Sequence, residues 1–277
     1  MKKILALLLT TFTTFSAFSQ YTYGEPVPVK TKEGPSGIKS TRFGLFIAPN
    51  SSWMKPTATK SNDGLYNVSN TGSNIGFSWG LMIDHFFDEN YGIASGIQLT
   101  TSGGNITATY ANPVSTVAGS PSTVTEANID YRLQYLEIPF GLKLMSDNLS
   151  GGIRVFGNVG VTAGINISKK GSYEVSYTDT SYKSQISGAL IVKDVSGDNE
   201  KLRGGLSVTP VLFQMNLGGG IEYQATDKMS FYIGLFFNNG FAPDVTNPKE
   251  LKMDYEGTFS DGNVRLNNLA LKVGMFF

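Results

Sequence analysis

Residues 134–144 read Gln-Tyr-Leu-Glu-Ile-Pro-Phe-Gly-Leu-Lys-Leu, and this stretch decides the fold. Apolar side chains occupy every second position, and the positions between them are charged, small or Pro. One face holds Leu136, Ile138, Phe140, Leu142 and Leu144, and the other holds Glu137, Pro139, Gly141 and Lys143. A period of two over about ten residues is typical of a strand in a transmembrane β-barrel.

The same alternation recurs along the chain, most clearly at 153–165 and 213–223. Gly recurs too often in the apolar segments for a helical period, and after the amino terminus no stretch approaches eighteen consecutive apolar residues. We therefore predict eight strands. They are expected at 42–54, 75–87, 91–102, 131–146, 151–167, 211–225, 229–240 and 264–277.

The connections between these strands alternate strictly in length. Short polar turns are expected at 88–90, 147–150 and 226–228. Long connections rich in Ser, Thr, Asn and Gly are expected at 55–74, 103–129, 168–210 and 241–262. Outer-membrane barrels have short periplasmic turns and long extracellular loops. The prediction for 41–277 is therefore an all-β fold, an eight-stranded antiparallel transmembrane β-barrel with that orientation.

Both ends of the chain fit an exported barrel. Residues 1–19 combine a basic start, an apolar stretch at 4–18 and small residues at 17 and 19, which predicts a cleaved signal peptide. Residues 20–40 are rich in Pro and predict an extended periplasmic segment, which serves as a tether or as a peptide that docks onto a partner. The last strand ends on Phe277 and resembles the C-terminal signal read by the outer-membrane assembly machinery.

Composition excludes several classes of function. Lys plus Arg and Asp plus Glu number 22 each, so no basic patch for nucleic acid is expected. With no Cys and a single His, we expect no disulfide, thiol chemistry, metal centre or cofactor. That His, His85, falls in the lipid-facing register at the periplasmic rim. We predict no enzymatic activity, with a lipid-modifying enzyme as the second alternative.

The polar face of the predicted strands points into the barrel and carries four basic and three acidic residues. They are Arg42, Asp84, Glu137, Lys143, Arg154, Glu222 and Lys272. The bore of an eight-stranded barrel is just wide enough to be filled by side chains. We therefore predict that these charges pair in a structural network, the alternative being a conductive or proton-relay channel.

Two local features complete the prediction for the barrel wall. Aromatic residues near the first and third short turns are expected to form an interfacial girdle. They are Phe86, Phe87, Tyr91, Tyr223, Phe231 and Tyr232. Pro139 lacks a backbone donor, which predicts a local bulge or a carbonyl satisfied from the lumen.

Residues 135–143, Tyr-Leu-Glu-Ile-Pro-Phe-Gly-Leu-Lys, resemble the Y-L-E-I-P-x-x-x-K signature of the PorT-like outer-membrane β-barrels of Bacteroidetes-type bacteria. The resemblance extends to Gly44-Leu45-Phe46, the Gly-rich central strands and the closing aromatic strand. The chain differs from a minimal member in its long connection 168–210, where alternating segments at 172–177 and 187–192 predict a hairpin above the membrane.

The resemblance implies a role in the cell envelope, because the founding PorT member is implicated in type IX protein secretion. We expect an accessory or scaffold subunit of a secretion or outer-membrane assembly complex, the first alternative being a surface adhesin or ligand-binding barrel. The expected partners are outer-membrane lipid and lipopolysaccharide, the assembly machinery during biogenesis, and other envelope proteins. Contacts with those proteins are expected through 168–210 or the amino-terminal segment.

Overall fold

The structure, a computed structural model, describes residues 40–60, 64–112, 124–149, 151–179, 191–201, 207–241, 245–246 and 264–277. The strands are β1 Thr41–Pro56, β2 Tyr66–Phe86, β3 Tyr91–Tyr110, β4 Val124–Met145, β5 Ile153–Asp179, β6 Ile191–Lys201, β7 Ser207–Val208, β8 Val211–Thr226, β9 Met229–Gly240, β10 Val245–Thr246 and β11 Val264–Phe276. The predicted signal peptide, and the segment 20–40 up to residue 39, lie outside the described residues. Within the described residues, no helix is long and apolar enough to cross a membrane.

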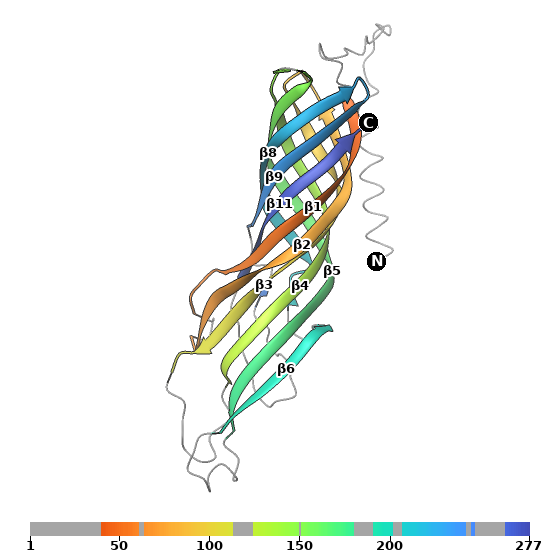
Figure 1. Ribbon diagram of the computed structural model, residues 1–277. Helices are drawn as coiled ribbons and strands as arrows, with labels where there is room; N and C mark the ends of the chain where they lie inside the picture. Colours follow the sequence, from red (N-terminus) through yellow and green to blue (C-terminus); the bar gives the residue numbers. More distant parts are fainter. Residues whose placement is uncertain are drawn as a thin grey trace, which may run out of the picture. The chain divides into compact units, whose positions relative to one another are not determined.

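Eight of these strands form a closed antiparallel ring (Figure 1). Their order is β1-β2-β3-β4-β5-β8-β9-β11, and β11 pairs back onto β1 from Gly44↔Phe276 to Pro56↔Val264. Closure leaves no free sheet edge around the barrel, so every barrel strand has a hydrogen-bonded neighbour on both sides. The predicted eight-stranded antiparallel barrel is confirmed.

The side chains of β4 show how the barrel is divided along its length. From Leu136 to Leu144 the outward residues are apolar and 40–55% exposed, whereas inward Glu137 and Lys143 are 2% and 4% exposed. Beyond Leu136 the pattern inverts: inward Leu133 is fully buried, and its outward neighbour Arg132 has 58% of its side chain exposed. One end of the barrel therefore has an apolar outside and a polar inside, and the other has the reverse.

The exposed apolar residues continue around the ring and form a band. We call the following set the apolar band: Phe43, Leu45, Ile47, Phe77, Trp79, Leu81, Ile83, Ile97, Leu136, Ile138, Phe140, Leu142, Leu144, Val155, Val159, Val161, Ile165, Ile167, Phe213, Met215, Leu217, Ile221, Phe231, Ile233, Leu235, Leu269, Leu271 and Val273. Soluble monomers rarely expose a contiguous apolar patch larger than a few hundred Å². A belt that encircles the barrel therefore faces hydrocarbon.

Beyond the apolar band, β2 to β5 continue into a second folded part. We define the extension as residues 66–74, 103–110, 124–135 and 168–179 together with β6, which pairs with the outer half of β5 from Lys170↔Lys201 to Asp179↔Ile191. Its interior is a single apolar cluster. The buried members include Met54, Tyr66, Val68, Ile106, Ala108, Val124, Ala127, Ile129, Tyr131, Leu133, Tyr135 and Val175.

The extension corrects the predicted loop boundaries. The connections predicted at 55–74, 103–129 and 168–210 are much shorter, because β2 begins at Tyr66, β3 ends at Tyr110, β4 begins at Val124 and β5 runs to Asp179. The predicted hairpin segment 172–177 lies in β5, and its partner is β6 at 191–201 instead of 187–192, of which 187–190 lies outside the described residues. Outside the lipid the outward positions are polar and the inward ones apolar, so the alternation has the opposite polarity there from that of the predicted strands.

The predicted irregularity at Pro139 takes a milder form than a bulge. The β3–β4 register is the same on both sides of Pro139, where the pairs are Ser95↔Phe140 and Gln98↔Glu137. Pro139 and Ile138, which lie between these pairs, have no partner on β3. Ser95 Oγ donates to the Pro139 carbonyl at 2.9 Å. Ser95 shares the outward register of Ile97, so this hydroxyl comes from the lipid-facing side of the wall, and no inserted residue is needed.

Candidate functional site: the charge network in the lumen

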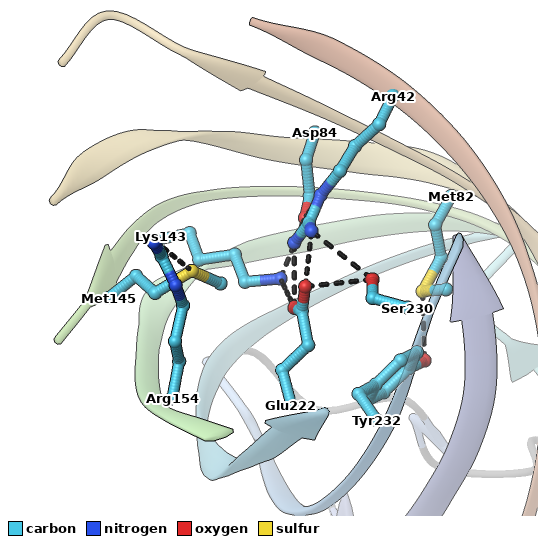
Figure 2. Close-up of polar contacts among 9 residues, drawn as sticks. All are labelled: Arg42, Met82, Asp84, Lys143, Met145, Arg154, Glu222, Ser230 and Tyr232. Carbon is cyan, nitrogen blue, oxygen red and sulfur yellow. Dashed lines mark hydrogen bonds and ion pairs between the residues drawn. The ribbon is translucent and has the colours of Figure 1, made fainter. Parts of the chain in front are cut away.

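Five side chains from five strands meet inside the barrel near the short turns (Figure 2), and we call them the first cluster. Arg42 Nη2 donates to Asp84 Oδ2 at 2.9 Å and to Glu222 Oε2 at 2.7 Å, and Arg42 Nη1 contacts Glu222 Oε1. Lys143 Nζ lies 2.6 Å from Asp84 Oδ2 and 3.5 Å from Glu222 Oε2. Ser230 Oγ donates to Glu222 Oε1 at 2.9 Å. Each carboxylate therefore bridges both cations.

Aromatic rings enclose the two cations of this cluster. The Arg42 guanidinium lies 4.0 Å from the ring centre of Phe276 and 5.1 Å from that of Phe86. Lys143 Nζ lies 4.8 Å from the ring centres of Phe156 and Phe276. Ring faces attract cations, and the low dielectric around them strengthens the ion pairs. The network is held by a ring-lined pocket, not by open water.

A second cluster lies further along the lumen. Glu137 Oε2 accepts hydrogen bonds from Gln98 Nε2 at 2.5 Å and from Thr100 Oγ1 at 2.7 Å. The carbonyl oxygen of the same Gln98 amide, Oε1, accepts from Lys272 Nζ at 3.2 Å. Lys272 also lies over the rings of Phe46 and Phe236, with 4.6 Å to each centre. A neutral amide therefore links the acid and the base of this cluster.

The remaining predicted residue, Arg154, stands apart. It is only 4% exposed, and its Nη1 lies 3.7 Å from Met145 Sδ (Figure 2). Glu222 is its cross-strand partner, but the Glu222 carboxylate contacts Arg42 and Lys143. Among the described residues, no carboxylate lies within ion-pair distance of Arg154. All seven predicted charges are buried and point inward; six belong to the two clusters, and Arg154 lies outside both.

A cavity of about 60 Å³ lies between the two clusters. Its lining includes Asp84, Lys143, Tyr232 and Lys272. A water needs roughly 10–15 Å³ of such volume, so the cavity has room for a few waters with polar partners. The lumen around it is filled by side chains, which is the arrangement expected for eight strands.

Sequence reasoning placed two aromatic residues on the wrong side of the wall. Phe86 and Tyr232 were predicted in the interfacial girdle, but both are buried in the lumen, at 8% and 5% exposed. Phe86 covers Arg42, and the Tyr232 hydroxyl donates to Met82 Sδ at 2.8 Å. Each lies between two outward-facing residues, so the period of two, applied strictly, predicts that both side chains point into the lumen. The other four predicted girdle residues are 44–58% exposed; they are Phe87, Tyr91, Tyr223 and Phe231.

The described residues hold no group of three or more His, Asp or Glu side chains arranged for a metal ion. His85 lies at the short-turn end of β2, exposed, with Nδ1 2.7 Å from Thr41 Oγ1 and its ring edge-on to Phe87. Two acidic residues of β6, Asp194 and Asp198, accept hydrogen bonds from serine hydroxyls of β5 at 2.6 Å.

The closed apolar band and the polar, side-chain-filled lumen define a transmembrane β-barrel. The chain belongs to the family described as "Outer membrane protein beta-barrel domain", which matches residues 18–241, and the protein is located in the outer membrane. No curated protein matches the sequence.

Similar solved structures include Ail, the attachment invasion locus protein of Yersinia pestis, in complex with the heparin analogue sucrose octasulfate. It is 10% identical, with a TM-score of 0.33, and the match covers 86% of this chain and 99% of that chain. Neisserial surface protein A is 12% identical, with a TM-score of 0.35 and coverage of 86% and 98%. OprG from Pseudomonas aeruginosa is 11% identical, with a TM-score of 0.34 and coverage of 85% and 92%.

The filled lumen leads to a prediction about conductance. We expect the purified protein to show no steady, porin-like conductance in planar bilayers, because charged and aromatic side chains occupy the bore. Lys143→Ala should lower stability instead of opening a channel, because it removes the cation between two buried carboxylates. Reproducible large openings of the unmodified protein would show that the lumen is a pore.

Proposed function

We propose that this protein is a non-enzymatic scaffold of the outer membrane, and that its binding surface is the extension. In this proposal it serves as an accessory subunit of a protein secretion complex of the type IX kind or of an outer-membrane assembly complex. The observation that carries the proposal is the apolar core of the extension. Four strands continue beyond the lipid and supply most of a buried apolar cluster, to which β1, β7, β8 and β11 also contribute, so the chain builds a folded sheet where a simple anchor needs only short loops.

The lumen supports a structural role, because six of its seven charges are held by ion pairs or hydrogen bonds. The carboxylates of the first cluster each contact both cations, and Glu137 accepts two hydrogen bonds. The single His is exposed on the outer wall at the short-turn end, on the opposite side of the wall from its neighbour Asp84 of the first cluster. We therefore assign the function to the extramembrane surface, without catalysis.

The PorT-like signature supports the choice of a secretion or assembly role. Its charged residues, Glu137 and Lys143, lie in the two lumen clusters, and Pro139 lies in the wall between them. The motif therefore corresponds to a particular way of packing the lumen. The long connection 168–210, part of which lies in the extension, is where the resemblance predicts that this chain differs from a minimal member.

The experiment removes β6 and keeps the barrel. Residues 180–206 are replaced by a 20-residue Gly-Ser linker, which leaves β5 paired with β4. β5 continues fourteen residues beyond Ile165, the partner of Val211, which is about 46 Å of strand. The linker reaches about 66 Å when extended, so it spans this distance.

We expect the β6-deleted protein to remain a folded, heat-modifiable barrel but to lose a stoichiometric outer-membrane partner during affinity purification in mild detergent. The matched control replaces residues 113–123 with Gly-Ser of equal length and should retain the partner. Recovery of the unmodified protein as a free monomer would contradict the scaffold role and favour a surface adhesin or ligand-binding barrel. Retention of the partner by the β6-deleted protein would show that this strand is not part of the binding surface.

A further inference from the structure

Three basic side chains form a row across the outer face of the extension, on three neighbouring strands. Arg132 of β4 is the cross-strand partner of Lys170 of β5, and Lys170 is in turn the partner of Lys201 of β6. All three residues are exposed. We call them the basic row. Side chains directly opposite each other in a sheet have Cβ atoms about 5 Å apart, and like charges in these positions destabilise the pairing.

Within the described chain the basic row has little compensating charge. Arg132 Nε lies 3.8 Å from Asp130 Oδ2, and Asp130 also accepts a hydrogen bond from Asn74. No carboxylate of the described residues lies within ion-pair distance of Lys170 or Lys201. The row therefore holds three adjacent positive charges against one shared carboxylate, which is an arrangement that an external anion stabilises.

The height of the row relative to the apolar band identifies the kind of anion. On β4 the last outward apolar residue is Leu136, four residues from Arg132; on β5 it is Ile167, three residues from Lys170. The two separations are about 13 and 10 Å along the strands. For the usual strand tilt they correspond to roughly 10 and 7 Å along the bilayer normal. The headgroup layer is about 5–8 Å thick, and long basic side chains reach back toward it along apolar surface.

A second like-charge pair stands on the opposite wall. Lys55 of β1 is the cross-strand partner of Arg265 of β11, and both are exposed. Lys55 lies two residues beyond Trp53, whose ring stacks on Phe237 at 6.2 Å near the edge of the apolar band. In the ring order, the β4–β5 and β11–β1 seams are separated by four strands in either direction. The same unusual pairing therefore occurs twice, on opposite walls, beyond the same edge of the band.

The short-turn end carries the opposite charge. Among the described residues, its exposed Asp, Glu, Lys and Arg side chains are Asp88, Glu89, Asp147, Asp227 and Lys228, four acids and one base. Among the described residues, adjacent like-charged basic pairs across neighbouring strands therefore occur at the end opposite these turns.

We infer that the basic row and the Lys55/Arg265 pair bind the phosphate groups of a phosphorylated glycolipid in the outer leaflet. Ammonium and guanidinium groups form charge-assisted hydrogen bonds with phosphate oxygens, and Arg does so with two donors at once. A lipid is the occupant because both sites lie beside the headgroups, on opposite sides of the barrel, where a single soluble partner does not reach both.

The test compares two variants of equal charge. The full-length protein in mixed micelles is titrated with diphosphoryl lipid A and with its dephosphorylated form, and bound lipid is measured by native mass spectrometry. The variant is Arg132→Gln with Lys170→Gln, and the control is Lys60→Gln with Lys228→Gln, which removes two exposed cations elsewhere. Loss of one basic residue near an anionic surface weakens binding about 5-fold, which is the effect expected for Lys170→Gln alone. The double variant is expected to bind the diphosphoryl form about 30-fold more weakly than the unmodified protein.

The control should bind diphosphoryl lipid A like the unmodified protein, and the dephosphorylated lipid should not distinguish the three proteins. Equal affinity of the variant and the unmodified protein would overturn the inference, as would an equal loss in the control. Soluble heparin serves as the competing polyanion. If the variant loses affinity for heparin but not for lipid A, the row is a site for a soluble polyanion and the inference is wrong. Heat-modifiability verifies that every variant is folded.

Discussion

Glu222→Ala is expected to lower the free energy of unfolding by about 3–5 kcal/mol. Glu222 is 1% exposed and contacts Arg42, Lys143 and Ser230. Its removal leaves two buried cations facing the single carboxylate of Asp84. Breaking a buried ion network by deleting one partner is costly, because the remaining charge has neither water nor a counter-ion.

The measurement is reversible urea unfolding in phospholipid vesicles. The matched control is Glu89→Ala, an exposed turn carboxylate whose removal should change stability by less than about 0.5 kcal/mol. The double variant Arg42→Met with Glu222→Leu removes one charge of each sign and should recover most of the loss, because Asp84 and Lys143 still pair. A Glu222→Ala loss no larger than that of Glu89→Ala would mean that the first cluster does not stabilise the barrel.

Phe140→Arg is expected to cost about 2–4 kcal/mol, whereas Gln134→Arg should be nearly neutral. Both residues belong to β4 and share the outward register. Phe140 is the middle one of the five outward apolar residues from Leu136 to Leu144 and is 55% exposed. A cation there replaces a lipid-facing ring near the centre of the bilayer. Gln134 is the first outward residue beyond the apolar band.

The same vesicle unfolding assay compares these two variants. Because the introduced residue and strand are the same, a difference in stability reports the depth of the position. Equal effects of the two substitutions would mean that the apolar band does not mark the lipid. A larger cost at Gln134 would place the bilayer around the extension instead.

The period of two carries most of the fold information in this sequence. It identifies the lipid-facing side of each strand because burial in hydrocarbon demands unbroken apolar residues at alternate positions. It does not identify the extension, because residues such as those at 126–134 alternate polar outside and apolar inside, which is also the pattern of a soluble sheet. The alternation on β4 is continuous from Glu126 to Met145, but its polarity inverts after Tyr135.

For the charge network too, the sequence indicates which side chains point inward, but only the fold shows which of them contact each other. Strand parity predicts that Arg42 and Glu222 point inward, but they are 180 residues apart and meet only because of the closed register. The link through Gln98 between Glu137 and Lys272, and the separation of Arg154 from the carboxylates, depend on how the strands are staggered. Stagger is a property of the whole ring, which a single sequence does not specify.

The central claim is that one continuous barrel changes from a lipid-facing to a water-facing exterior between Leu136 and Gln134. The most direct test uses the absence of Cys from the chain. Single Cys residues are introduced at the even positions from 126 to 144 of β4, spin-labelled and reconstituted in vesicles, and their accessibility to oxygen and to a water-soluble nickel complex is measured. We expect oxygen accessibility to peak near position 140 and accessibility to the nickel complex from 134 to 126. Uniform accessibility along the strand, or oxygen accessibility that continues to 126, would contradict it.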